Sequence, residues 1–393
     1  MTALLGDPHL RYPLAALNID AVRHNLAEMD HYLRSRSVQI APHAKTTMLQ
    51  EVLTLQTQLA MTWGLTVANA AQGRLAEKAG AQRILVANQL IECDDIAWAA
   101  RAARAGRTVI SLVDTPEGVR WLDTALAKAG DRTASPRHPV LLEVGYRGGR
   151  GGTRTQQDVD SVADVVTGSR HLALHGVSGY EGLLGGSGDP ADVERVDAYL
   201  RRVVQAAIRL VDRGTVAGPE LILSAGGSAF FDRVIGVCQD PLTAIGGLLL
   251  LRSGCYAVHD HGIYARTIPK SRSAGGPDLR PAATVWARVQ SRPDAGCAIA
   301  AVGRRHLPHD AGLPTPLQIR YRGGVPGPLT AAASTVALSD QHLHMDVPAD
   351  SDLAVGDVLP LGISHPCGLF DRWRLVTIID DQGRLIGAGR PGF

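Results

Sequence analysis

Lys45 stands where an apolar run of the sequence gives way to a loop. The run Val38–Pro42 is typical of a β-strand, Pro42 cannot extend a hydrogen-bonded ladder, and Thr46 is able to cap a helix that follows. Lys45 and its neighbour His43 are therefore expected just beyond the carboxyl end of a strand. A desolvated lysine there can form a Schiff base with an aldehyde cofactor. The alternative is an ordinary solvated lysine in a loop.

Two later turns are suited to binding an anion. One is Gly226-Gly227-Ser228 at the end of an apolar run, and the other is Arg252–Tyr256 after the next run. Successive backbone N–H groups in such turns can bind phosphate, although glycine pairs also serve plain chain reversal.

A third group of reactive residues, Ser364-His365-Pro366-Cys367, lies near the end of the chain. In an extended segment the side chains at positions i and i+2 point the same way, so His365 and Cys367 could bind one metal ion. Imidazole and thiolate suit zinc best, and two protein ligands would leave room for water or substrate. A buried cysteine beside an unrelated histidine is the alternative.

Other polar clusters are less informative. We interpret His259–His261 as mainly structural, and we consider His342 a weaker candidate for an extra ligand or base. Asp310 is as compatible with a turn as with a site. Arg147 and Arg150 lie in a glycine-rich stretch, where one of them could face a pyridine nitrogen or both could be solvated.

The elements that must position these residues alternate between short apolar runs and amphipathic stretches, which is typical of βα units around a parallel sheet. Eight strands are predicted, and eight is the number of a TIM barrel. We place them at Val38–Pro42, Trp63–Asn69, Arg83–Gln89, Thr108–Asp114, Pro139–Arg147, Leu172–Tyr180, Leu221–Ser228 and Gly247–Gly254. Predicted helices between them include Thr46–Ala60, Ala70–Gly80, Asp94–Gly106 and Ala191–Gly214.

The pattern changes after about Tyr264, where Pro269–Pro281 resembles a linker. The later segments alternate without long helices, as in an antiparallel β-domain. They are Thr284–Val289, Cys297–Val302, Leu317–Tyr321, His342–Val347, Val358–Ile363 and Arg374–Ile379, with the early run Leu14–Ile19 expected to join them. The predicted fold class is thus α/β, a (β/α)8 TIM barrel over residues 20–266 followed by an antiparallel β-domain made of residues 1–19 and 267–393.

This arrangement brings the candidate residues together. Active sites of such barrels lie at the carboxyl ends of the strands, and phosphate is commonly bound after the seventh and eighth strands. Both glycine turns fall there, opposite Lys45 after the first strand. Their conjunction predicts a pyridoxal 5'-phosphate site with Lys45 as the cofactor lysine.

Composition excludes several other classes of protein. The 393 residues include 40 Lys plus Arg and 38 Asp plus Glu, without a basic stripe, so no nucleic-acid partner is expected. No apolar run is long enough to cross a membrane and the first residues are not signal-like, so a cytoplasmic protein is expected. Five scattered cysteines argue against a disulfide framework.

The same motifs resemble the alanine racemase-like, fold-type III pyridoxal-phosphate proteins, in particular the D-serine dehydratase and D-threonine aldolase branch. The resemblance covers nearly the whole chain, from Pro42–Thr46 to His365–Cys367. It implies Lys45 and His43 in catalysis, His365 and Cys367 on a divalent metal, and a homodimer. The cofactor contacts that it implies are Lys45, Arg150, Tyr180, Gly226, Gly227, Ser228, Gly254, Cys255 and Tyr256.

Two departures from the aldolase pattern favour a dehydratase. Thr46 is followed by Thr47-Met48 instead of His-Lys, and the metal pair is His-x-Cys instead of His-x-Asp. The Thr-Thr-Met ending resembles a bacterial subgroup described as amino-acid deaminases. The expected reaction converts a D-3-hydroxy amino acid such as D-serine into a 2-oxo acid and ammonia, with zinc, or else manganese or magnesium, acting on the 3-hydroxyl group.

Three alternatives stay open at this point. Retro-aldol cleavage would give glycine and an aldehyde. A racemase would need a second base, and no tyrosine of the β-domain stands out for that role. A non-catalytic cofactor carrier would need only the barrel, which the additional domain argues against.

Overall fold

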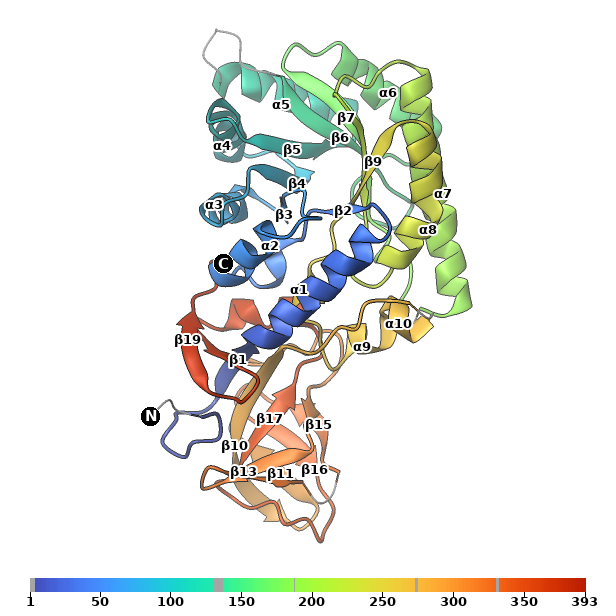
Figure 1. The fold of residues 1–393 in the computed structure, drawn as a ribbon. Helices are drawn as coiled ribbons and strands as arrows, with labels where there is room; N and C mark the ends of the chain where they lie inside the picture. Colours follow the sequence, from blue (N-terminus) through green and yellow to red (C-terminus); the bar gives the residue numbers. More distant parts are fainter. Residues whose placement is uncertain (1–3, 130–136, 187, 273–274, 330–331) are drawn as a thin grey trace.

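The computed structural model describes residues 4–129, 137–186, 188–272, 275–329 and 332–393. Two sheets organise it (Figure 1). The first is parallel and eight-stranded, in the order β2-β9-β8-β7-β6-β5-β4-β3. Its strands are β2 (Gln39–Ile40), β3 (Leu65–Val67), β4 (Arg83–Gln89), β5 (Thr108–Val113), β6 (His138–Val144), β7 (Leu172–Gly179), β8 (Leu221–Ala225) and β9 (Gly247–Leu251).

Bridges from Ile40 to Thr62 and from His43 to Thr66 join β2 to β3, so the sheet curls toward closure as a barrel does. All eight predicted barrel strands are present, and the predicted fold class is confirmed. The strands carry near-continuous apolar runs because helices cover their outer face. Leu249, Leu250 and Leu251 of β9, for example, are all buried.

Helices connect the barrel strands, and Figure 1 shows them around the outside. The longest helix, α7, buries a stripe that includes Val196, Leu200 and Val203 at the spacing of one helix face. The barrel helices are α1 (Ile19–Arg34), α2 (Gln50–Thr57), α3 (Ala70–Lys78), α4 (Cys93–Arg104), α5 (Pro116–Ala129), α6 (Gln156–Thr167), α7 (Pro190–Asp212) and α8 (Phe231–Ala244).

The second sheet has eleven strands and forms the β-domain, drawn below the barrel in Figure 1. As predicted, the early strand β1 belongs to it, pairing antiparallel with β10 and parallel with β18. Its strands are β1 (Leu14–Asn18), β10 (Ala283–Asp294), β11 (Cys297–Ala300), β12 (Thr315–Pro316), β13 (Ile319–Arg322), β14 (Val325–Pro328), β15 (Ser334–Leu338), β16 (Leu343–Asp346), β17 (Val358–Gly362), β18 (Val376–Ile379) and β19 (Leu385–Gly389).

Sequence patterns missed β12, β14, β15 and β19. Strand β14 contains two prolines and β19 contains two glycines, and both residue types weaken a strand signal. The predicted linker Pro269–Pro281 lies partly outside the described residues, and its start folds as the short helix α10 (Pro269–Arg272). Among the described residues, no helix combines the length and the apolarity that a membrane crossing needs.

The junction between barrel and β-domain positions the site. Helix α9 (Ile263–Thr267) follows the barrel and lies beside α10 between the two sheets (Figure 1). The N–H of His261 donates to the carbonyl of Ile363 at 3.0 Å, and the N–H of Ile263 donates to the carbonyl of Ser364 at 3.1 Å. These bonds hold the segment after β17 against the segment after β9.

Candidate active site

The loop that carries Lys45 leaves the end of β2. Ala41 N–H donates to the Leu251 carbonyl of β9 at 2.8 Å, so the strand is held until Pro42. The short 3-10 turn η1 (Ala44–Thr46) follows, and its Lys45 is exposed, rather than desolvated as we expected. Thr46 does not cap a helix as predicted: α2 starts only at Gln50, and the Thr46 hydroxyl faces the sulfurs of Cys255 and Cys367.

His43, immediately before that turn, keeps a buried Nδ1 atom without a hydrogen-bond partner. Burial, reinforced by the charges of Lys45 and of nearby arginines, holds the pKa of His43 well below its usual value. The imidazole is therefore neutral at pH 7, and its free nitrogen can bond with a molecule at the barrel mouth.

The glycine turn after β8 is organised by a residue that the sequence did not single out. Glu181 is fully buried and accepts the N–H of Gly226 at 3.2 Å and the N–H of Gly227 at 2.5 Å. Burial raises the pKa of this carboxyl. We expected both N–H groups to face a phosphate. In this structure both N–H groups are bonded to Glu181.

The turn after β9 packs against both neighbouring loops. Cys255 N–H donates to Ser228 Oγ at 3.1 Å, which joins the two predicted anion turns. A Cβ atom at Gly254 would lie 2.6 Å from the His43 carbonyl oxygen and 2.6 Å from Thr46 Oγ1, so only glycine fits there. Tyr256 is buried with its hydroxyl 3.5 Å from Gln56 Nε2. Its phenol therefore lies against Gln56 of α2.

Arg252, which opens that turn, was part of a predicted motif but not of the predicted site. Its buried guanidinium donates to Ser178 Oγ at 2.8 Å and also to the Gly179 carbonyl. It therefore fixes the end of β9 to the end of β7 and supplies positive charge near Glu181.

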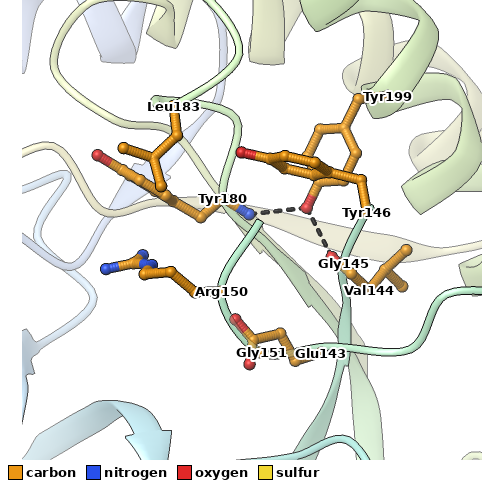
Figure 2. Close-up of a pocket in the computed structure, with 9 residues that line it drawn as sticks. All are labelled: Glu143, Val144, Gly145, Tyr146, Arg150, Gly151, Tyr180, Leu183 and Tyr199. Carbon is orange, nitrogen blue, oxygen red and sulfur yellow. Dashed lines mark hydrogen bonds between the residues drawn. The ribbon is translucent and has the colours of Figure 1, made fainter. Parts of the chain in front are cut away.

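Arg150 and Tyr180 line one pocket together with Glu143 and Tyr146 (Figure 2). The Arg150 guanidinium carbon lies 4.4 Å from the centre of the Tyr180 ring, in cation–π contact. Tyr199 donates to the Val144 carbonyl at 2.6 Å and accepts the Tyr180 N–H at 2.8 Å, which fixes the strand ends behind them. Arg147 is exposed in the same loop.

A cluster of two thiols and one imidazole lies where the β-domain meets the barrel mouth. The candidate ligand atoms of Cys255, His365 and Cys367 all lie within 4.8 Å of one another. The Sγ atoms of Cys255 and Cys367 are 3.3 Å apart, and Thr46 Oγ1 lies 3.5 Å from Cys367 Sγ. We call Cys255, His365 and Cys367 the thiol–imidazole cluster. The sequence paired His365 with Cys367 but assigned Cys255 to the cofactor, because that residue follows the phosphate turn.

Asp310 orients the imidazole of the cluster. Its Oδ2 lies 2.7 Å from His365 Nδ1, which leaves Nε2 as the nitrogen free to face the thiols. Burial lowers the pKa of His365, but hydrogen bonds to Cys255 and Asp310 outweigh burial and raise this pKa to about 9. A carboxylate behind a histidine is the usual support of a metal-binding imidazole.

Tyr264 of α9 covers the cluster and was not predicted. Its ring is 6.1 Å from the His365 ring in an edge-to-face arrangement, and burial, reinforced by the neighbouring Cys255 sulfur, raises the pKa of its hydroxyl well above the usual value. No motif marked it in the sequence.

In contrast, His342 is exposed before β16, outside the cluster. Asp260 accepts the N–H groups of Gly262 and Tyr264, a structural role like the one we expected for its segment.

Comparisons with known proteins agree with this arrangement. The family model "Alanine racemase, N-terminal domain" matches residues 17–236, and "Putative serine dehydratase domain" matches residues 282–379. A 3-hydroxy-D-aspartate aldolase of Paracoccus denitrificans (strain Pd 1222) is 22% identical over 79% of this chain and 76% of its own.

Among solved structures, D-threonine aldolase from Filomicrobium marinum has a TM-score of 0.80 at 23% identity, covering 100% of this chain and 98% of its own. D-threo-3-hydroxyaspartate dehydratase from Delftia sp. HT23 has a TM-score of 0.76 at 20% identity, covering 98% of each chain. The first family model spans more than half of the sequence. This chain therefore belongs to the alanine racemase-like family of fold-type III pyridoxal-phosphate proteins, as its motifs predicted.

Proposed function

We propose that this chain is a pyridoxal-phosphate- and metal-dependent lyase that acts on D-3-hydroxy amino acids. One observation carries the proposal: Thr46, adjacent to Lys45, has its hydroxyl 3.5 Å from Cys367 Sγ of the thiol–imidazole cluster. The cofactor lysine and the metal ligands thus share one mouth, so a small substrate can meet both. The three relatives described above are named for reactions of D-hydroxy amino acids, which supports this substrate class.

The residues at the mouth fit the cofactor. Lys45 is exposed there, His43 offers a buried nitrogen without a partner, and Gly254 lets the turn after β9 pack closely against the loop of Lys45. When bound, pyridoxal phosphate would supply an electron sink for negative charge at the substrate Cα. Lys45 would hold the cofactor and then exchange a proton with the substrate, while Arg150 and Tyr180 would border the ring.

The thiol–imidazole cluster fits a soft or borderline divalent ion. Two thiolates and one imidazole are ligands that zinc prefers, whereas magnesium and manganese favour oxygen, so we propose zinc. Cys255 gives the site a third protein ligand, one more than the sequence predicted. A metal ion there would polarise the 3-hydroxyl group of the substrate. Asp310 would keep Nε2 of His365 directed at the ion.

The comparisons support carbon–carbon cleavage better than the dehydration that we expected first. Both curated relatives are 3-hydroxy-D-aspartate aldolases, and a D-threonine aldolase is a structural relative. We therefore propose retro-aldol cleavage to glycine and an aldehyde as the leading reaction.

Dehydration is the second candidate because of one observation on the metal pair. Solved variants of a D-threo-3-hydroxyaspartate dehydratase replace a histidine and a cysteine two residues apart, and the cysteine variant is in a metal-free form. His365 and Cys367 have the same spacing in this chain.

The homodimer expected from the family stays a prediction.

Product analysis separates the two reactions. The purified protein, supplied with pyridoxal phosphate and zinc, is incubated with D-threonine, D-serine and D-threo-3-hydroxyaspartate, with and without chelator, and L-threonine serves as control. We expect glycine and acetaldehyde from D-threonine only, and loss of both products on chelation. A 2-oxo acid from D-serine without glycine would favour dehydration. No product from any D-3-hydroxy amino acid would refute the proposal.

A further inference from the structure

Two cysteines far apart in the sequence meet between the barrel and the β-domain. Cys255 follows β9 and Cys367 lies in the turn after β17, 112 residues later, yet their Sγ atoms are 3.3 Å apart. Cys255 is only 5% exposed, whereas Cys367 is only partly buried. Cys367 is therefore the more exposed residue of the pair.

The distance between the two sulfurs is shorter than in a pair of zinc-bound thiolates and longer than in a disulfide bond. Two thiolates on a tetrahedral zinc ion, each about 2.3 Å from it, are about 3.7 Å apart. A disulfide bond is about 2.05 Å long. From 3.3 Å the sulfurs need to separate by a few tenths of an ångström to bind a metal, or approach by little more than 1 Å to form a bond. Side-chain rotation can supply either movement.

We propose that Cys255 and Cys367 form an oxidant-sensitive pair, which a hydroperoxide converts into a disulfide between the two domains. The idea rests on the proposed function only in assuming that the same sulfurs bind zinc in the reduced protein. Because one disulfide consumes both sulfurs, it leaves His365 as the sole ligand of the thiol–imidazole cluster. Oxidation and metal binding are therefore mutually exclusive.

The chemistry balances with a hydroperoxide as the only oxidant. The Cys367 sulfur attacks the O–O bond and becomes a sulfenic acid, while the outer oxygen leaves as water or an alcohol. The Cys255 sulfur then attacks the Cys367 sulfur, so an S–S bond forms, the S–O bond breaks and water leaves. Two electrons pass from the thiols to the peroxide, and both thiol protons end on oxygen. A thiol reductant reverses the change.

The surroundings favour a disulfide over further oxidation. The second sulfur already lies 3.3 Å from the first, so it can intercept the sulfenic acid before another peroxide arrives. Thr46 Oγ1 lies 3.5 Å from Cys367 Sγ and 3.9 Å from Cys255 Sγ. The cross-link would therefore form beside the loop of Lys45.

Peptide mass spectrometry tests the pair in the full chain loaded with cofactor. Metal-free protein is treated with hydrogen peroxide at an equimolar dose, alkylated and digested. We expect the peptides of Cys255 and Cys367 to be linked, with the loss of two hydrogen atoms, and dithiothreitol to separate them. Zinc at about 100 times its dissociation constant should slow the linkage roughly 100-fold, since binding protects the sulfurs by mass action.

Single substitutions make the assignment specific. Cys255→Ser and Cys367→Ser should each abolish the linked peptide, and Cys255→Ser should carry Cys367 on to sulfinic acid. Cys93→Ser, at an exposed cysteine on α4, is the matched control and should leave the linkage intact.

Two results would overturn the inference: Cys367 sulfinic acid without a disulfide in the unsubstituted protein, or linkage at the same rate with and without zinc. This readout does not depend on turnover. A linked pair in a protein without lyase activity would refute the proposed function alone, and an active lyase without linkage would refute this inference alone.

Discussion

Two histidines of the described residues lie in unlike surroundings, one in the wall of the barrel and one at the candidate site. Inside the barrel wall, His138 at the start of β6 lies 2.9 Å from Ser111 Oγ of β5, and both residues are buried. At the barrel mouth, His365 binds Asp310 and faces two thiols.

The difference lies in charge and access. Burial, followed by repulsion from His175, lowers the pKa of His138 to about 4, so this imidazole is neutral and serves packing. The pKa of His365 is instead raised to about 9 by anionic partners. A cluster of titratable residues therefore indicates function when it lies at the carboxyl ends of the strands with unlike partners, and structure when it fills the wall.

Among the substitutions that separate the two regions, Lys45→Ala should have the largest effect on lyase activity. We expect Lys45→Ala to lower lyase activity by roughly 10³-fold or more and to remove the visible absorbance of the bound cofactor, because no other group can take over its bond to the cofactor. Absorbance spectra and product assays measure both effects. Lys78→Ala, at an exposed lysine of α3, is the control. An unchanged cofactor band in Lys45→Ala would refute the assignment.

Asp310 should produce an intermediate effect. Asp310→Ala removes the carboxylate behind His365, so we expect zinc affinity to fall about 10- to 100-fold in chelator competition. Asp310→Asn keeps an oxygen that can accept from Nδ1 and should restore most of the affinity. Equal zinc affinity in all three proteins would show that Asp310 does not position the imidazole.

His138 should affect stability and leave chemistry unchanged. Its folded pKa of about 4 lies below the value of 6.5 for the unfolded chain, so only the unfolded state binds a proton between these values. This group therefore makes the protein less stable as pH falls from 6.5 toward 4. Between pH 7 and pH 5 the loss should be about 2 kcal/mol.

Urea unfolding at the two pH values checks this effect, with His138→Gln as the variant that lacks the titration. The variant should lose about 2 kcal/mol less than the unsubstituted protein does over the same interval. Identical losses in both proteins would mean that His138 is not the titrating group.

The barrel could be predicted from sequence because its signals are local. Each strand is an apolar run bounded by turn residues, and the run from Gly247 to Gly254 is an example. The predicted start of α2 was wrong. Thr46 is a good capping residue by type, but its hydroxyl contacts the Cys367 sulfur across the domain junction and caps no helix. Local propensity gave way there to a contact made by the tertiary structure.

Only those residues of the candidate site that lie in recognisable motifs could be predicted from the sequence. Lys45, Gly254, His365 and Cys367 lie in recognisable segments, and the structure brings them to one mouth. Glu181 and Asp310 bind partners that are 45 or more residues away in the sequence. Tyr264 packs near His365 from a short helix that carries no recognisable motif. Pairings at such separations leave no pattern in a single sequence.

The central claim is that one metal site joins the two domains through Cys255, His365 and Cys367. Zinc X-ray absorption of the reduced, zinc-loaded protein tests it most directly. We predict two sulfur ligands at about 2.3 Å and at least one nitrogen at about 2.0 Å, with one sulfur lost in Cys255→Ser and none lost in Cys93→Ser. A single sulfur in the unsubstituted protein, unchanged in Cys255→Ser, would contradict the account.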